Sequence, residues 1–472
     1  TIASNNADDS HSADTVQTEN VEMADLTSRE SLFKLVTDAW REVLRIDQCG
    51  PDDSFVVLGG NSLMLSQVVS RINQRLPYIL HMSFLMGSYT INEQVERLLE
   101  FGRSNPGSTA QTINEPVPHA EKETLSPAQQ RLWYLCQLNQ HTPAFNLTHT
   151  FRLRGPLNLT RLENAVTTII QRHPSLRSTF SHIDGVPIVR VIEDLPLSLS
   201  ITECICSNRD ESEKLAADHI RKEAAILYDL ERGPLFKCRL YRVAPDEYIF
   251  VFYIHHIISD GWSMAVILKE LSALYNTPQG QRDSVLRKLK INYFDYAAYM
   301  NNLEERSIHQ EDTAFWKEYF RDGLPILSLP ADFPRPKTLK FTAKLLTFTL
   351  PPELMRKITA YAGANKVTPF SILLAMYGLL LQRNSRQERI IIGCPIAGRN
   401  RVEFEPLIGL FLNMIPFNIE FRSDMSIEEL TLATYRNTVQ VFAHQNLQFG
   451  KLVELLQPER HLNINHVFQT MF

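Results

Sequence analysis

The sequence lacks the features that would place the protein in a membrane, outside the cell or on a nucleic acid. No apolar run reaches the roughly 18 residues that a membrane-spanning helix needs. The N-terminal residues are polar and acidic, without the basic segment and apolar stretch of a signal peptide. Lysine and arginine form no long run and the formal net charge is −5, which disfavours nucleic acid as a partner. We therefore expect a cytoplasmic protein that binds neither membrane nor nucleic acid.

Cysteine is also scarce, with six residues spread over a chain of 472. Cys204 and Cys206 form one close pair, but no second pair stands at the spacing of zinc ligands. In a reducing compartment, scattered cysteines are expected to be structural thiols. The sequence therefore predicts reduced cysteines and no metal site.

What the chain does contain is the composition of a globular protein, with 44% hydrophobic and 21% charged residues. Its length suggests two or three domains. Residues 1–27 are polar and nearly free of large apolar side chains, which predicts a disordered linker. Residues 102–123 are rich in proline, glycine, serine and threonine, which predicts a flexible linker. These segments leave one domain over residues 28–101 and another over residues 124–472.

The domain over residues 28–101 shows apolar residues at helical spacing. One stripe predicts a helix that begins near Ser28 and continues to Leu44. A second stripe, from Leu63 to Ile72, stops before Pro77, because the residue before a proline disfavours helix. A third helix is expected around residues 91–99. The pattern predicts a small all-helical domain.

The domain over residues 124–472 alternates strand-like and helical patterns. Strands are predicted over residues 145–153, 248–254 and 390–392, and helices over residues 162–172 and 263–275. The proline-rich segment from Leu327 to Lys340 lies between an amphipathic helix and a strand pattern. Such alternation indicates an α/β fold with a substantial sheet. A domain of this size should have two lobes, an N-lobe over about 124–300 and a C-lobe over about 301–472.

A serine follows two glycines at the start of the second predicted helix. Gly59 and Gly60 clear space in front of Asn61 and Ser62, both of which are residue types that cap helices. Capping is therefore one interpretation of Ser62. The other is a modified serine, because a phosphate at a helix N-terminus is stabilised by free N–H groups and by the positive end of the helix dipole.

The residues around Ser62 favour the second interpretation. The string Asp-Asp-x-Phe-x-x-Leu-Gly-Gly-Asn-Ser-Leu, from Asp52 to Leu63, resembles the peptidyl carrier domains of nonribosomal peptide synthetases, which are four-helix bundles. The resemblance implies that Ser62 carries 4'-phosphopantetheine, added by a separate phosphopantetheinyl transferase. Acyl carrier domains of polyketide synthases more often have an acidic residue at the position of Asn61.

Two adjacent histidines end the predicted strand over residues 248–254. Because successive strand residues point to opposite faces, only one of His255 and His256 should face a given cavity. An imidazole can accept a proton near neutral pH, so one of them is a candidate general base. A structural pair is the alternative, and a metal site is disfavoured because no third ligand is spaced nearby.

The residues after these histidines resemble a family signature. His255-His256-x-x-x-Asp260-Gly261-Trp262-Ser263 is similar to the active-site motif of condensation domains, which have a two-lobed chloramphenicol-acetyltransferase-like fold. The resemblance implies that His256 is catalytic and faces a channel between the lobes, while His255 faces away and supports the strand. It also implies that Asp260 is structural and pairs with Arg177, and that Gly261 leaves room for the pantetheine thioester.

Further motifs in the family order extend this resemblance over nearly all of residues 124–472. They are Ser126-x-Ala128-Gln129-x-Arg131-Leu132-Trp133, Arg172-His173-x-x-Leu176-Arg177-x-x-Phe180, Tyr293-x-Asp295-Tyr296-Ala297, Ile408-Gly409-x-Phe411-x-Asn413, His444-Gln445 with Phe449 and Leu452, and Arg460 with Asn465, Phe468 and Gln469. Trp133, Tyr296 and Phe411 are expected to fill the core. The chain ends soon after the last motif, so the C-lobe is expected to be incomplete.

The two resemblances together imply a step of nonribosomal peptide synthesis by an amide-forming acyltransferase. Ser62 would hold the donor acyl or peptidyl thioester, and the condensation domain would join it to an acceptor aminoacyl thioester. An upstream adenylation domain and a downstream acceptor carrier domain would be partners. Three alternatives stay open: a terminal cyclising domain, an epimerising domain, and a platform that docks carriers without catalysis. An acyl transferase that uses free acyl-coenzyme A is disfavoured by the attached carrier.

Overall fold

The computed structural model describes residues 25, 28–60, 62–76, 80, 82–104, 117–278, 281–303, 308–336, 343–459 and 463–472. Most of the predicted linker at 1–27 and residues 105–116 of the linker at 102–123 lie outside this part of the chain. The described residues belong to two compact units. The first contains Val117–Glu304 and Glu403–Phe411, and the second contains Glu19–Pro116, Glu305–Val402 and Leu412–Phe472.

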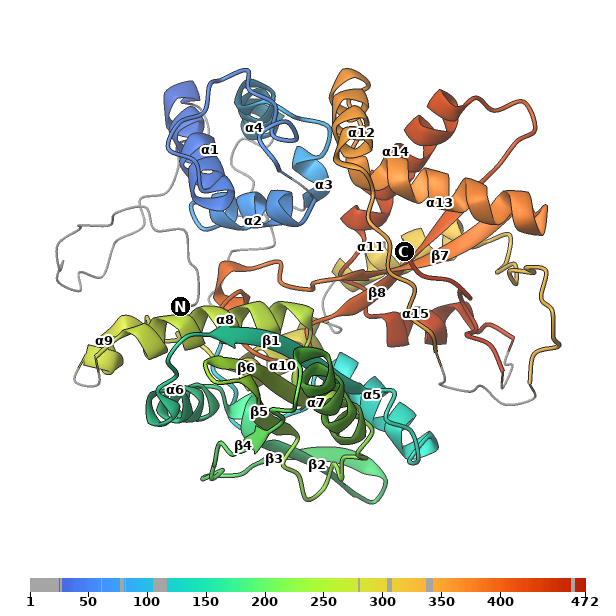
Figure 1. Ribbon diagram of the computed structural model, residues 1–472. Coiled ribbons are helices and arrows are strands. Elements are labelled where there is room, and N and C mark those ends of the chain that lie inside the picture. The colour runs from blue at the N-terminus through green and yellow to red at the C-terminus, as the bar shows by residue number, and fades with distance from the viewer. Residues whose placement is uncertain are drawn as a thin grey trace. The chain divides into compact units, whose positions relative to one another are not determined.

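Residues 28–104 form the helical domain that the sequence predicts (blue in Figure 1). Its helices are α1 (Arg29–Leu44), α2 (Ser62–Asn73), α3 (Met82–Leu85) and α4 (Ile91–Ser104). The Ser28 side chain accepts the N–H of Ser31 at 3.3 Å, which fixes the start of α1. Trp40 is fully buried and donates to Gln94 Oε1 at 3.0 Å, so α1 and α4 share a core with one satisfied polar contact. The three predicted helices are confirmed, and α3 is an addition.

The loop before α2 needs its two glycines for its own packing. Gly59 has φ +94°, a conformation that side chains disfavour. A Cβ at Gly60 would lie 2.4 Å from the Phe55 ring. The N–H of Phe55 donates to Tyr89 O at 2.7 Å, and the N–H of Gly60 donates to Phe55 O at 2.8 Å. The loop is thereby held against the chain that enters α4.

The first unit is built around a sheet with strand order β1-β6-β5-β4. The strands are β1 (Asn146–Arg154), β4 (Ile201–Glu203), β5 (Phe236–Ala244) and β6 (Glu247–His255), and only the β4–β5 pair is parallel. All nine residues of β6 are buried, as its continuous apolar run predicts. The registers place His255 opposite Asn146 and Phe252 opposite His149. The predicted strands over residues 145–153 and 248–254 are confirmed.

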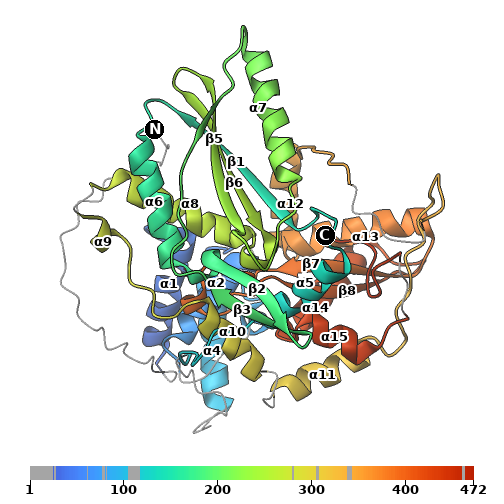
Figure 2. The ribbon, with the colours of Figure 1, turned by 90° about the horizontal axis from the view of Figure 1, so that it is seen from below.

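Helices cover both sides of this sheet. Figure 2 shows α7 (Arg209–Ala224) on one side and α6 (Leu159–Arg172) with α8 (Gly261–Asn276) on the other. The predicted helices over residues 162–172 and 263–275 correspond to α6 and α8. The unit is completed by α5 (Pro127–Leu138), the hairpin of β2 (Ser178–Ile183) and β3 (Val186–Val191), α9 (Arg282–Val285), α10 (Tyr293–Leu303), and the short 3-10 helices η1 (Pro174–Arg177), η2 (His256–Ile258) and η4 (Val402–Phe404).

The C-terminal part of the second unit packs helices on a two-stranded antiparallel sheet of β7 (Arg389–Ile396) and β8 (Asn413–Glu420). Its helices are α11 (Ile308–Tyr319), α12 (Pro352–Ala364), α13 (Pro369–Ser385), α14 (Ile427–Ala443) and α15 (Phe449–Leu456). β7 confirms the predicted strand over residues 390–392. In the part of the chain that is described, no single helix is long and apolar enough to cross a membrane, although α12 and α13, bent by 110°, pass that test as a pair.

Two features differ from the sequence-based predictions. The strand predicted after Lys340 is wrong for residues 343–350, which form no strand and expose Leu345, Leu346 and Phe348. Alternating apolar residues make a strand only where a neighbour accepts their backbone hydrogen bonds, and this segment has no ladder partner among the described residues. The segment Glu403–Phe411 belongs to the first unit, although its place in the sequence put it in the predicted C-lobe.

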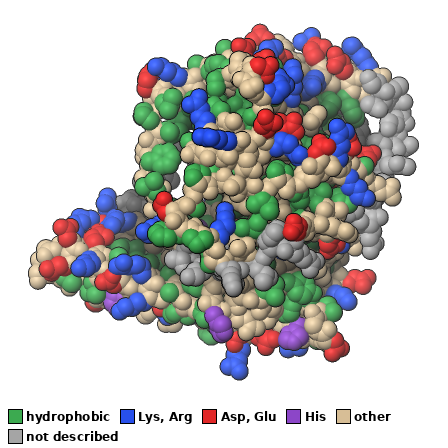
Figure 3. Space-filling view, turned by 90° about the vertical axis from the view of Figure 1, so that its right-hand side faces the viewer, with side chains coloured by type: hydrophobic (Ala, Val, Ile, Leu, Met, Phe, Trp, Pro, Cys, Tyr) green, Lys and Arg blue, Asp and Glu red, His purple; other side chains and the backbone are tan. Residues whose placement is uncertain are grey.

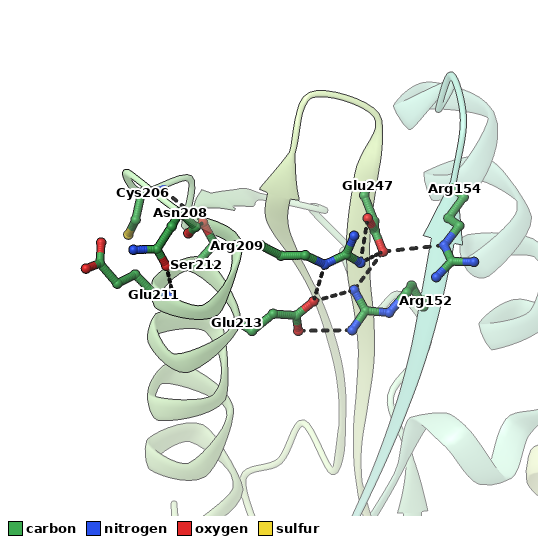
Figure 4. Close-up of polar contacts among 9 residues, drawn as sticks. All are labelled: Arg152, Arg154, Cys206, Asn208, Arg209, Glu211, Ser212, Glu213 and Glu247. Atoms are coloured by element: carbon green, nitrogen blue, oxygen red, sulfur yellow. Dashed lines mark hydrogen bonds and ion pairs between the residues drawn. The ribbon is translucent and has the colours of Figure 1, made fainter.

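Charged side chains tie α7 to the sheet (Figure 4). The Arg152 guanidinium contacts Glu213 Oε1 and Glu247 Oε1, each at 2.7 Å. Glu247 also accepts from Arg209 at 2.9 Å and from Arg154 at 3.4 Å. Elsewhere charges are mixed: on the face drawn in Figure 3, basic and acidic side chains are interspersed, so that face shows no large area of one sign.

The ion pairs of Arg152 with Glu213 and Glu247 should make the free energy of unfolding depend on pH. Hydrogen bonding from Arg152 holds the pKa of both Glu213 and Glu247 below the ordinary value of 4.5. A lowered folded-state pKa stabilises the fold above pH 4.5, and this stability is lost as the pH falls through the folded-state values. We expect Arg152→Gln to lower the free energy of unfolding by about 1 kcal/mol at pH 7 and by less at pH 3.5.

Urea denaturation at the two pH values measures this difference. Arg221→Gln is the matched control, because Arg221 lies on α7, the helix that carries Glu213, and forms its ion pair with Asp218, a partly exposed residue three positions away. If Arg152→Gln lowered the free energy of unfolding equally at both pH values, Arg152 would not be the cause of the lowered pKa values of Glu213 and Glu247.

Candidate active site

The two histidines lie where β6 turns into α8. β6 ends at His255, residues His256–Ile258 form the 3-10 turn η2, and Asp260 caps α8 by accepting the N–H of Ser263 at 2.8 Å. The apolar run of β6 buries the strand, and the capping aspartate begins a new helix immediately after it. The turn therefore stands at the end of a rigid buried strand, and its position is fixed from both sides.

His255 is a buried, neutral imidazole. It is 5% exposed, and burial, with a smaller contribution from the charge of His256, lowers its pKa to about 3. Its Nδ1 accepts the N–H of Ile257 at 3.2 Å, and the Tyr228 ring packs edge-on at 5.9 Å. A ring in this state supports the turn and has little capacity to exchange protons near neutral pH.

His256 is only partly buried, and its tautomer is fixed. Its Nδ1 lies 2.8 Å from the carbonyl oxygen of Ser259. A carbonyl oxygen accepts and does not donate, so Nδ1 must carry the proton. In the neutral ring the lone pair is then on Nε2. The main-chain N–H of His256 donates to Phe145 O at 2.8 Å, which holds the residue to the chain entering β1.

Asp260 is structural, but its predicted pairing with Arg177 is wrong. The Arg177 guanidinium donates to main-chain carbonyls of Ile170, Gln171, Ile192 and Glu193. Arg177 ends η1, where it joins the end of α6 to the end of β3, and none of its described hydrogen bonds reaches Asp260.

The Asp260 carboxylate holds the segment Glu403–Phe411 instead. Its Oδ2 accepts the N–H of Phe411 at 3.1 Å, and its Oδ1 accepts the hydroxyl of Ser263 at 2.8 Å. The Ser263 hydroxyl also lies 2.9 Å from Gly409 O and 3.0 Å from Gly409 N. The indole of Trp262 donates to Glu405 O at 3.0 Å. The motif Asp260-Gly-Trp-Ser therefore binds the later segment that contains Ile408-Gly-x-Phe through hydrogen bonds.

Tyr293 of the tyrosine motif connects the opening motif to the same segment. The hydroxyls of Ser126 and Tyr293 lie 2.9 Å apart, and Tyr293 donates to Leu410 O at 2.6 Å. A Cβ at Gly409 would lie 2.0 Å from the Tyr293 ring, so this position needs glycine. On the other side, Gln129 Nε2 donates to Ile257 O at 2.9 Å. Sequence reasoning missed this last contact, although the spacing Ser-x-x-Gln signals a capping box.

Other residues of the motifs have structural roles. Trp133, Tyr296 and Phe411 are each at most 4% exposed, which confirms that they fill the core. Asn413 donates to Leu447 O at 3.0 Å and accepts the N–H of Phe449 at 2.9 Å, so it fixes the loop before α15. Arg460 lies outside the described residues.

Ser62 is the first residue of α2, a helix of 12 residues. The side chains of Asn61, Ser62 and Leu63 lie outside the described part of the chain. All six cysteines are free thiols. Among the described residues, no group of three or more histidine, cysteine, aspartate or glutamate side chains is placed to hold a metal ion.

Comparison with known families matches both parts of the chain. Residues 119–472 match the family described as condensation domain, and residues 34–98 match the family described as phosphopantetheine attachment site. The chain belongs to the condensation-domain family. The predicted order, a carrier domain followed by a condensation domain, is confirmed, and so is the prediction of a phosphopantetheine carrier.

The relatives of this condensation-domain chain are large synthases. It is 32% identical over 433 residues to bacitracin synthase 3 of Bacillus licheniformis, covering 92% of this chain and 6% of the relative. It is 31% identical over 439 residues to malpibaldin synthetase of Mortierella alpina, covering 93% of this chain and 8% of the relative. The chain therefore spans less than a tenth of the length of these curated relatives.

Solved structures confirm the predicted fold. The X-domain from teicoplanin biosynthesis matches with a TM-score of 0.68 at 22% identity, over 76% of this chain and 78% of that chain. The first condensation domain of the calcium-dependent antibiotic synthetase, in complex with a substrate analogue, matches with a TM-score of 0.61 at 20% identity, over 71% and 78% of the two chains. At these identities the likeness establishes the condensation-domain fold.

The contact of Gly409 with Tyr293 should make the condensation domain sensitive to one methyl group. We expect Gly409→Ala to lower the free energy of unfolding by about 1–3 kcal/mol, because the added carbon overlaps a buried ring. Gly450→Ala is the control, since a Cβ there meets no heavy atom within 4 Å. Denaturant titration of both variants measures the difference, and equal stabilities would show that the segment Glu403–Phe411 is not packed on Tyr293.

Proposed function

We propose that the chain forms an amide bond between a donor acyl group held on Ser62 and the α-amino group of an acceptor aminoacyl thioester. One observation carries this proposal. His256 is partly exposed, and its Nδ1 is committed to the Ser259 carbonyl, which leaves Nε2 as a hydrogen-bond acceptor. The same chain contains a domain of the phosphopantetheine attachment family, which supports a thioester as the substrate.

The residues around Ser62 fit 4'-phosphopantetheine. A serine at the first position of a 12-residue helix lies where main-chain N–H groups and the helix dipole favour a phosphodiester. The backbone at Gly60 packs directly against the Phe55 ring, and the Gly60 N–H donates to Phe55 O, so the described part of the preceding loop is fixed at Gly60. When bound, the group would supply a terminal thiol that carries the donor acyl group as a thioester and leaves as the free thiol.

His256 would act on the acceptor amine. With Nδ1–H donating to Ser259, Nε2 accepts a hydrogen bond from the amine. This hydrogen bond orients the amine so that the lone pair of the amine nitrogen points at the acyl carbon. As the C–N bond forms, the amine loses one proton, and His256 Nε2 can accept it. Alignment alone supplies a large part of such a rate enhancement. We assign His256 to orienting the amine at least as much as to removing its proton.

The neighbouring residues would keep this geometry. A Cβ at Gly261 meets no heavy atom within 4 Å, which is consistent with space beside His256 for a thioester. His255 supports the turn as a neutral ring, and Asp260 holds the segment Glu403–Phe411. The proposed partners are a phosphopantetheinyl transferase, an upstream adenylation domain and a downstream acceptor carrier. The transferase draws the arm from coenzyme A, which favours the cytoplasm as the place of the proposed reaction.

The first test is loading of Ser62. Incubation with a phosphopantetheinyl transferase and coenzyme A should increase the intact mass by one phosphopantetheine in the wild type and leave Ser62→Ala unchanged. A wild-type chain that gains no mass under conditions that load a known carrier would refute the attachment.

The second test is amide formation after loading. With a donor on Ser62 and an acceptor on a separate carrier, we expect His256→Ala to lower product formation by about 100-fold or more, because a positioned acid–base group contributes 10²–10⁴-fold. His219→Ala, which removes an exposed histidine on α7, should behave as the wild type. If His256→Ala formed product at the wild-type rate, the catalytic role of His256 would be refuted, and a platform that docks carriers would be the remaining interpretation.

A further inference from the structure

A glutamine of the opening motif holds the turn that carries His256. Gln129 lies on α5 and is 1% exposed. Its Nε2 donates to the carbonyl oxygen of Ile257, the residue after His256, at 2.9 Å. Its Oε1 accepts the N–H of Ser126 at 3.1 Å. One buried side chain therefore joins the start of α5 to the turn with His256.

These two partners allow only one orientation of the amide. Ser126 offers an N–H and requires an acceptor, whereas Ile257 offers a carbonyl oxygen and requires a donor. Flipping the amide would place oxygen against oxygen and N–H against N–H. The capping box at Ser126 uses Oε1 alone, and a glutamate would serve it equally well. The Nε2 group is thus needed for the turn and not for the helix.

Several other polar groups of the turn are paired within the turn itself. The N–H of Ser259 donates to His256 O at 3.3 Å, while Nδ1 of His256 donates back to Ser259 O at 2.8 Å. The N–H of Ile257 donates to His255 Nδ1 at 3.2 Å. The Ile257 carbonyl receives its hydrogen bond from a side chain of another helix. Leaving a buried carbonyl without a donor costs free energy, so loss of Gln129 would favour a shift of this backbone, which carries His256.

We propose that Gln129 is a positioning residue for amide formation, which fixes the His256 turn so that Nδ1 stays on the Ser259 carbonyl and Nε2 is presented to the substrate. The effect on rate rests on the proposed function, but the effect on the imidazole does not. Gln129 does not touch the reacting atoms. It acts through the main chain of Ile257, so its loss should lower kcat more than it raises KM.

The kinetic test uses neighbouring glutamines. Gln129→Leu removes the donor to Ile257, whereas Gln130→Leu makes the same chemical change one residue later, where Nε2 donates to Leu125 O at 3.2 Å. We expect Gln129→Leu to lower kcat between about ten- and hundredfold, since a misplacement of about 1 Å can cost 100-fold. Gln130→Leu should stay within about twofold of the wild type. Equal kcat values for the two variants would overturn the proposal.

Gln129→Glu provides a pH-dependent rescue, measured under conditions where the variant is fully folded at every pH. An ionised carboxylate repels the Ile257 carbonyl, but a protonated one donates to it and still accepts from Ser126. Burial raises the pKa of a carboxyl group. The ratio of variant to wild-type kcat at the same pH should therefore rise as the pH falls, and the ratio cancels the titration of the acceptor amine. A ratio that is flat between about pH 5.5 and 8.5 contradicts the proposal.

A measurement without substrate separates this inference from the proposed function. ¹⁵N spectra of the histidine side chains report which ring nitrogen carries the proton. The His256 signals are assigned as those that are missing from the spectrum of His256→Asn. We expect Nδ1–H in the wild type and in Gln130→Leu, and a mixture of tautomers in Gln129→Leu. If the wild type makes no amide, the proposed reaction fails while these spectra still decide the role of Gln129. Unchanged Nδ1–H in Gln129→Leu would overturn it.

Discussion

The Asp260 carboxylate is the contact on which the site depends, because it connects a local helix cap to a distant part of the chain. One oxygen accepts from Ser263 at the start of α8, and the other accepts from the N–H of Phe411. A carboxylate that is 2% exposed would be costly to bury without such donors. With these donors, the Asp260 carboxylate fixes both the end of the histidine turn and the segment Glu403–Phe411.

A chain of buried hydrogen bonds connects the Asp260 carboxylate, through the segment Glu403–Phe411 and the opening motif, to the turn with His256. Leu410 in the segment Glu403–Phe411 accepts from Tyr293, whose hydroxyl lies beside that of Ser126. The N–H of Ser126 donates to Gln129 Oε1, and Gln129 Nε2 donates to Ile257 O in the turn. Each of these connections, apart from the local cap at Ser126, joins elements that are far apart in the sequence. In a network of this kind the loss of one member leaves buried groups without partners on both sides. These motifs of the family are therefore positions in one buried network, and His256, at its edge, is partly exposed.

The sequence predicted the elements well because hydrophobic period and helix-capping residues are local signals. β6 could be recognised from its apolar run, α1 from its stripe and from Ser28, and α8 from the residues that follow Asp260. It failed where geometry depends on distant partners. The family resemblance implies a pairing of Arg177 with Asp260, but main-chain carbonyls at the ends of α6 and β3 occupy Arg177. A strand was predicted after Lys340, but residues 343–350 have no described neighbour with which to form a ladder.

The contrast between the two histidines shows why the same residue type, twice in succession, can have opposite roles. β6 ends at His255, whose ring enters the packed interior, whereas His256 begins the 3-10 turn η2, where its ring is only partly buried. Burial then makes His255 a poor base, and its Nδ1 is used as an acceptor for the main chain. His256 uses its Nδ1 as a donor to the main chain, which reverses the assignment and leaves the lone pair on Nε2. The tautomer of each ring follows from whether the turn offers it an N–H or a carbonyl. The tautomer of His256 is therefore decided by the backbone that surrounds it, and any residue that sets that backbone would share in the control of the proposed reaction.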